Sequence, residues 1–405
     1  MAETELDKLI EGLRDEMVKA MVNLIEKVAI SPLNGGKGEL ERANYIMGLL
    51  NEIGFDEIKR IDAKDNFGYI RPNIIAIIHG ENRNKTKWIV THMDTVPEGD
   101  RSLWKTDPFK GVVVGDKIYG RGTTDNGQSL IASIYAVKAI KMSKIKPKTN
   151  IGLIFVSDEE TGSEYGLKHV LNNYTFGKND EFLVPDYGNE DGSAIEVAEK
   201  GILWFRIKTY GIQAHASTPH LGLNAHRIGM LYSIYIDEIL HRKFNKTNDL
   251  FDPPYSTFEP TKKECNVQNI NTIPGTDVVY FDCRILPEYK IDDVIAEIEK
   301  AKKEFEEKHK VKIEVEIIQR ADPAPPTDPS SEIVKTLSAI IERKRSIKPK
   351  VIGIGGGTVA AYLREKGYPA VAWSTIDPVE HSPNEYCKIE NMVNDAKVFA
   401  EYLIS

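Results

Sequence analysis

The sequence predicts an α/β protein, with a mixed, largely parallel sheet flanked by helices and a separate α+β domain inserted into it. Three observations lead to this fold class. Short runs rich in Ile and Val alternate with helical stretches over the first 200 residues, as in α/β proteins. Between residues 202 and 321 apolar and charged residues alternate within a strand, which is typical of a sheet with one solvent-exposed face. After the Pro-rich stretch 322–329 the α/β pattern returns.

We therefore expect a discontinuous domain of residues 1–201 and 322–405, and an inserted domain of residues 202–321. The length of 405 residues agrees with more than one domain, because it is about 2.7 times a typical 150-residue domain.

In the first domain, apolar residues spaced three and four apart from Leu6 to Val28 predict an amphipathic helix. A second helix is expected near residues 39–53, ended by Gly54. The other expected elements are buried strands at 73–78, 87–91 and 150–157, a helix of small residues at 127–142, and, after the inserted domain, a helix at 330–345 and strands at 351–354 and 370–373.

The inserted domain is expected to follow the order strand, helix, strand, helix, strand. Its predicted elements are 203–209, 225–240, 278–286, 291–310 and 311–317.

Composition excludes several classes of protein. The formal charge is −8, which argues against binding to nucleic acid or to an acidic membrane surface. The apolar runs are too short to span a membrane, and the N-terminus lacks the pattern of a signal peptide. Three cysteines without metal-ligand spacing indicate a reducing compartment. We expect a cytoplasmic protein.

The first candidate site residues follow the predicted strand that ends at Val90. His92 and Asp94 point to the same side of an extended chain, so one can bind a metal while the other orients the imidazole. A surface loop is the alternative interpretation.

Three further carboxylates lie in two short motifs. Asp125 lies in Gly-Arg-Gly-Thr-Thr-Asp-Asn-Gly, just before a predicted helix, and Glu159 and Glu160 follow a buried strand. Adjacent carboxylates repel each other unless a cation or a proton offsets their charge. One of them bound to a metal and the other free as a base would explain the pair. The alternatives are an ordinary turn and acidic residues at a helix N-terminus.

Asp186 and His381 complete a set of ligands at strand ends. With His92, Asp125 and Glu160 they supply two imidazoles and three carboxylates, a set that suits Zn²⁺ or a similar divalent ion. The set divides into two sites that share one carboxylate.

These motifs, in this order along almost the whole chain, resemble the dinuclear metallohydrolases that include glutamate carboxypeptidase, aminoacylase, acetylornithine deacetylase and succinyl-diaminopimelate desuccinylase. The resemblance implies that His92, Asp125 and Asp186 hold one metal and that Asp125, Glu160 and His381 hold the second. Two divalent ions are implied, with Zn²⁺ expected and Co²⁺ or Mn²⁺ as alternatives.

The resemblance also implies roles around the metals. Glu159 is the expected general base, Asp94 supports His92, and the bond from Asp125 to Asn126 is expected to be cis.

Residues 202–321 resemble the ferredoxin-like dimerisation or lid domain of these enzymes. His215 resembles the histidine that reaches the partner subunit's active site, with His220 as the alternative, and a homodimer through this domain is implied. The positions that resemble substrate-binding residues are Asn271, Arg284, Gly356, Gly357 and Thr358. Each of these also has an ordinary structural interpretation, such as an ion pair of Arg284 with Asp282 or a simple glycine turn.

The implied reaction is hydrolysis of an amide bond in a small peptide or N-acyl-amino acid that carries a carboxylate. A carboxypeptidase, a dipeptidase and a deacylase all fit. Desuccinylases of the family tend to have Gly-Gly-Thr-Ser-Asp where this chain has Gly356-Gly357-Thr358-Val359-Ala360, which weakens that assignment. A dinuclear aminopeptidase and a non-catalytic binding protein on the same fold are the remaining alternatives.

Overall fold

The computed structural model describes residues 4–405, which form two compact units. Unit 1 comprises residues 4–197, 327–352 and 358–405, and unit 2 comprises residues 198–326 and 353–357. The catalytic and lid roles expected of the two domains stay predictions.

Unit 1 is built on a mixed eight-stranded sheet. In sheet order its strands are β1 (Glu57–Arg60), β4 (Ile74–Ile78), β8 (Thr149–Val156), β5 (Asn82–His92), β9 (Glu181–Val184), β18 (Ala370–Ala372), β10 (Ala194–Glu199) and β17 (Lys350–Ile354). The four strands β8, β5, β9 and β18 are parallel, whereas β1, β4 and β10 pair antiparallel with their neighbours. Central strands are buried along their length because helices cover both faces.

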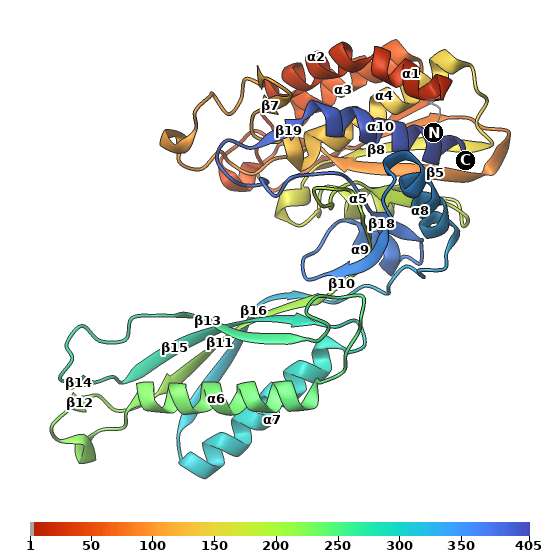
Figure 1. Ribbon diagram of the computed structural model, residues 1–405. Helices are drawn as coiled ribbons and strands as arrows, with labels where there is room; N and C mark the ends of the chain where they lie inside the picture. Colours follow the sequence, from red (N-terminus) through yellow and green to blue (C-terminus); the bar gives the residue numbers. More distant parts are fainter. Residues whose placement is uncertain (1–3) are drawn as a thin grey trace. The chain divides into compact units, whose positions relative to one another are not determined.

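Helices cover both faces of this sheet (Figure 1). On one face lie α1 (Glu5–Gly12), α2 (Arg14–Ile25), α3 (Leu40–Ile53), α4 (Gln128–Ser143) and α10 (Ile389–Ile404), with α8 (Glu332–Arg345) beside α10. On the other face lie α5 (Leu167–Asn173) and α9 (Ala360–Glu365). The small residues of α4 allow α1, α2 and α10 to pack closely on it. The single helix expected from Leu6 to Val28 is wrong in detail, because the first helix ends at Gly12 and a second begins at Arg14.

Smaller strands connect loops of unit 1. β6 (Val112–Val114), β7 (Lys117–Tyr119) and β19 (Tyr386–Lys388) form a three-stranded sheet, and β2 (Ala63–Lys64) pairs with β3 (Ile70–Arg71). The pairing of β19 with β7 places the segment after His381 beside the loop that precedes α4.

Unit 2 has the strand and helix order of a ferredoxin-like domain. The elements are β11 (Gly201–Tyr210), α6 (Ala225–Lys243), β13 (Thr257–Lys263), β15 (Thr276–Ile285), α7 (Ile291–His309) and β16 (Lys312–Ala321), with a small sheet of β12 (Ala214–His215) and β14 (Thr272–Ile273). The four long strands are antiparallel in the order β13-β15-β11-β16, and both helices lie on one face of the sheet (Figure 1).

The core of unit 2 lies between these helices and the sheet, where Phe205 stacks on Phe281. The sequence does not predict β13, because this edge strand carries a proline and mostly exposed polar residues instead of an apolar alternation. The mixed α/β fold class is confirmed. None of the helices formed by residues 4–405 is both long and apolar enough to cross a membrane.

Candidate metal centre

Three parallel strands of unit 1 bring candidate ligands to one edge of the sheet. His92 is the last residue of β5 and pairs in register with Val156, the last residue of β8. Glu159 and Glu160 follow β8, and Asp186 follows β9, the other neighbour of β5. Carboxyl ends of adjacent parallel strands meet at the same edge, so these side chains converge.

Asp125 reaches the same place from the loop before α4. Gly122 begins the turn with a φ of 81°, and a Cβ atom there would lie 2.4 Å from Cγ2 of Thr95, so only glycine fits. The bond between Asp125 and Asn126 is cis, which confirms the expectation from the family resemblance.

The five predicted ligands form one connected cluster. His92 Nε2 lies 2.7 Å from Asp125 Oδ1 and 3.3 Å from Asp186 Oδ1. His381 Nε2 lies 3.0 Å from Asp125 Oδ2 and 3.1 Å from Glu160 Oε2. Asp125 therefore offers one oxygen to each histidine, which is the arrangement needed of a carboxylate shared by two sites.

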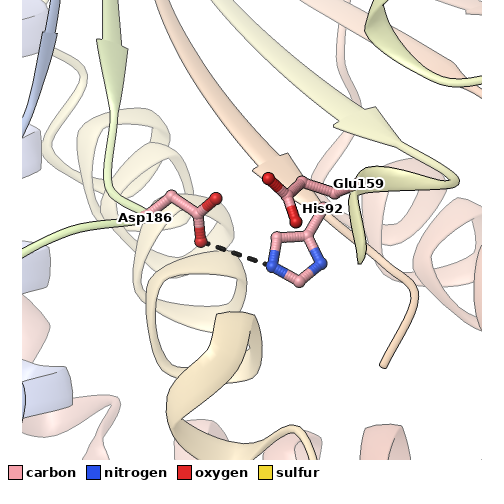
Figure 2. A group of neighbouring side chains, drawn as sticks. All are labelled: His92, Glu159 and Asp186. Carbon is pink, nitrogen blue, oxygen red and sulfur yellow. Dashed lines mark ion pairs between the residues drawn. The ribbon is translucent and has the colours of Figure 1, made fainter. Parts of the chain in front are cut away.

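Glu159 and Asp186 flank the ring of His92, as Figure 2 shows. One nitrogen or oxygen from each of these three residues lies within 4.8 Å of the others, and the same holds for His92, Asp125 and Glu160. No described residue hydrogen-bonds to the carboxylate of Glu159, although its backbone amide donates to Asp94.

Burial and repulsion between carboxylates disfavour the ionised forms of the two glutamates. Burial, followed by the charge of Asp125, raises the pKa of Glu160 to about 7. Burial and Asp186 also raise the pKa of Glu159. Hydrogen bonds to Asp125 and Glu160 raise the pKa of His381 to about 10.

The residues fit divalent metal ions. Oε1 of Glu160 is buried and has no hydrogen-bond partner among residues 4–405, so it is a buried acceptor without a donor. Two imidazoles and several carboxylates around such an oxygen are the donor set expected for Zn²⁺ and similar ions.

Asp94 organises the turn of the two glutamates. Its Oδ1 and Oδ2 accept the backbone amides of Glu159 and Glu160, each at 3.0 Å. Nδ1 of His92 lies 3.1 Å from the backbone carbonyl of Asp94 and 3.5 Å from its carboxylate. Asp94 thus contacts His92 mainly through its backbone carbonyl, and the amides of Glu159 and Glu160 through its carboxylate.

The remaining predicted histidines belong to unit 2. Nδ1 of His215 accepts from the backbone amide of Ser217 at 3.2 Å and lies 2.7 Å from its hydroxyl oxygen, so a neutral His215 carries its proton on Nε2. The ring of His220 makes no hydrogen bond to the described residues, and both histidines are exposed.

Arg284, also in unit 2, makes the ion pair that the sequence left open as an alternative. Its Nε and Nη2 donate to the two carboxylate oxygens of Asp282 at 2.6 and 3.0 Å, and Nη1 donates to the carbonyl of Gly355 at 2.8 Å. The exposed backbone of Asn271 accepts from Ala216 at 2.8 Å.

The glycine turn divides between the units. Gly356 and Gly357 are exposed in unit 2, whereas Thr358 is buried in unit 1, where its hydroxyl accepts from the amide of Ala360 at 3.1 Å. A local contact of this kind is typical of a turn between a strand and a helix.

Four buried residues behind the centre are not predicted as site residues by the sequence. Arg71 pairs with Glu39, and Arg121 pairs with Glu385. Their partners are distant in sequence, so no local pattern could reveal them, although Arg121 lies within the glycine-rich motif.

The chain is similar to several known proteins. Residues 88–405 match the family described as Peptidase family M20/M25/M40. A relative from Methanocaldococcus jannaschii, named an uncharacterised metallohydrolase, is 44% identical over 96% of this chain and 99% of its own. The succinyl-diaminopimelate desuccinylase of Rickettsia bellii is 29% identical over 94% of each chain. The M20 family metallo-carboxypeptidase of Sulfolobus solfataricus has a TM-score of 0.73 and 22% identity, over 96% and 98% of the two chains.

Proposed function

The chain belongs to Peptidase family M20/M25/M40 and is a metallohydrolase of peptide or other amide bonds, and we propose that it cleaves small substrates that carry a free carboxylate, such as dipeptides or N-acyl-amino acids. The observation that carries the proposal is the cluster in which Asp125 offers one oxygen to His92 and the other to His381. We also propose that the centre holds two metal ions, with Zn²⁺ as the expected metal.

Glu159 is the proposed general base. Bound divalent cations would polarise the scissile carbonyl and increase the acidity of the attacking water. The carboxylate of the half-buried Glu159 accepts the proton of that water and delivers it to the leaving nitrogen, a transfer worth about 10²–10⁴ in rate. His215, which presents Nε2–H, would stabilise the developing oxyanion from the partner subunit.

Arg284 is the proposed anchor for the substrate carboxylate. A guanidinium has five N–H donors, and its contacts with Asp282 and Gly355 use three of them. The other two remain for a substrate, and the glycine turn supplies exposed backbone groups nearby in unit 2.

A homodimer through unit 2 belongs to the same proposal. Met230, Leu231 and Ile234 lie on one side of α6 at spacings of three and four, with 46%, 49% and 60% of their surface exposed. A second copy of the chain would cover this apolar stripe and bring His215 to the other subunit.

Desuccinylation is the second candidate, favoured by the Rickettsia bellii relative and weakened by the Gly356–Ala360 sequence.

The deciding experiment measures hydrolysis of dipeptides, N-acetyl-amino acids and N-succinyl-diaminopimelate with Zn²⁺, Co²⁺ or Mn²⁺. The same dipeptide with an amidated carboxyl terminus is the matched control. Equal rates on the free and amidated dipeptides would contradict carboxylate recognition, and no hydrolysis of any amide with any metal would contradict the function.

A further inference from the structure

A buried ion pair lies behind the metal centre. Arg121 and Glu385 are 2% and 0% exposed, and Nη1 of Arg121 donates to Oε2 of Glu385 at 2.6 Å. Neither residue is a predicted ligand, but Arg121 precedes Asp125 by four residues and Glu385 follows His381 by four. The pair therefore joins the two loops that carry these ligands.

Glu385 holds the backbone of the Asp125 loop. Its Oε2 accepts from the amide of Gly122 at 3.0 Å, and its Oε1 accepts from the amides of Thr124 and Asp125 at 2.9 and 3.1 Å. With the bond from Arg121, the two oxygens accept four hydrogen bonds, which is their full capacity.

Arg121 holds the other loop, because its Nη2 donates to the backbone carbonyl of His381 at 3.3 Å. We propose that the Arg121–Glu385 pair is a positioning device that sets the distance between Asp125 and His381, and with it the affinity for the metal that these two hold with Glu160. This inference rests on the proposed metal centre. Groups that orient metal ligands in this way typically change metal affinity about 10- to 100-fold when they are mutated.

The geometry favours positioning over general stabilisation. A buried ion pair adds little net stability, since its desolvation offsets the attraction between the charges. Here, however, the carboxylate accepts three backbone amides from one loop, those of Gly122, Thr124 and the ligand Asp125 itself. A small displacement of that backbone would move the oxygen that faces His381.

The test uses full-length protein loaded with Co²⁺ and titrated with a chelator of known affinity, followed by visible absorption. Glu385→Gln should weaken Co²⁺ binding about 10- to 100-fold and change the absorption bands. The double variant Glu385→Gln with Arg121→Gln has the net charge of the wild type, so an equal weakening would come from geometry and not from lost charge.

The matched control is the buried pair of Arg364 and Glu196 in the same unit, whose side chains meet at 2.8 and 2.6 Å. Glu196→Gln should lower thermal stability, because it leaves the charge of Arg364 buried without its carboxylate. Alone or with Arg364→Gln, it should leave Co²⁺ affinity within about threefold of wild type. If Glu385→Gln does not fold, Arg121→Lys keeps the charge and removes the bond to the His381 carbonyl, and should also weaken binding.

The inference would be overturned if the Glu385 or Arg121 variants kept the Co²⁺ affinity and absorption bands of the wild type. It would also be overturned if Glu196→Gln weakened Co²⁺ binding as much as Glu385→Gln does. Failure of the wild-type protein to bind Co²⁺ would instead refute the metal centre and the proposed function.

Discussion

Without metal, the centre should make the protein less stable as the pH rises, and Glu160 should cause much of this effect. The side chain of Glu160 is only 6% exposed, one of its oxygens has no hydrogen-bond partner, and burial with the charge of Asp125 raises its pKa from 4.5 to about 7. The folded protein therefore binds the Glu160 proton more tightly than the unfolded chain does. The free energy of unfolding falls as the pH rises from about 4.5 to about 7, because the unfolded chain releases this proton first.

A shift of about 2.5 units corresponds to roughly 3 kcal/mol at 1.36 kcal/mol per unit. Glu160→Gln removes the ionisation but keeps the shape. In metal-free protein, the stability of Glu160→Gln relative to wild type should therefore increase by roughly 3 kcal/mol between pH 4.5 and pH 8.

The assay is urea unfolding of chelator-treated protein at several pH values, with Glu164→Gln as the control, because the side chain of Glu164 is 70% exposed and pairs only with Lys168. Zn²⁺ should remove most of the pH dependence of the wild type, since the cation offsets the repulsion. The reasoning would be refuted if the free energy of unfolding of metal-free wild type and of Glu160→Gln changed with pH in parallel. The folded state would then not disfavour ionisation of the Glu160 carboxylate.

Four further results are expected. Excess EDTA should abolish turnover and added divalent metal should restore it, and a rate unchanged in metal-free protein would contradict metal-dependent catalysis. Glu159→Ala should retain metal by elemental analysis but lose about 10²–10⁴ in kcat, while Glu164→Ala keeps the wild-type rate; a Glu159 variant with half of that rate would exclude the base role. Arg284→Met should raise KM for a carboxylate substrate more than it lowers kcat, and an unchanged KM would exclude the anchor. Ile234→Glu should convert a dimer to monomers in light scattering, unlike Ile145→Glu at an exposed site of unit 1, and a persistent dimer would place the interface elsewhere.

The site residues that could be predicted from the sequence are those that lie next to a local pattern, such as an apolar strand or a glycine motif. His92 ends one apolar strand, Glu159 and Asp186 follow two others, and parallel strands bring their ends to one edge of the sheet. The Gly-Arg-Gly motif likewise marked the Asp125 loop, because Gly122 needs a backbone conformation that other residues rarely adopt.

What the sequence by itself determined was the alternation of elements, the two-part organisation and the inventory of imidazoles and carboxylates. Only the tertiary structure decided which atoms meet. The two oxygens of Asp125 contact His92 and His381, and the carboxylate of Glu385 accepts backbone amides from a loop some 260 positions earlier in the chain. The physical reason is that helix and strand patterns arise from neighbours along the chain. Contacts between distant loops depend instead on how the sheet and the packed helices bring those loops together, and no local periodicity encodes them.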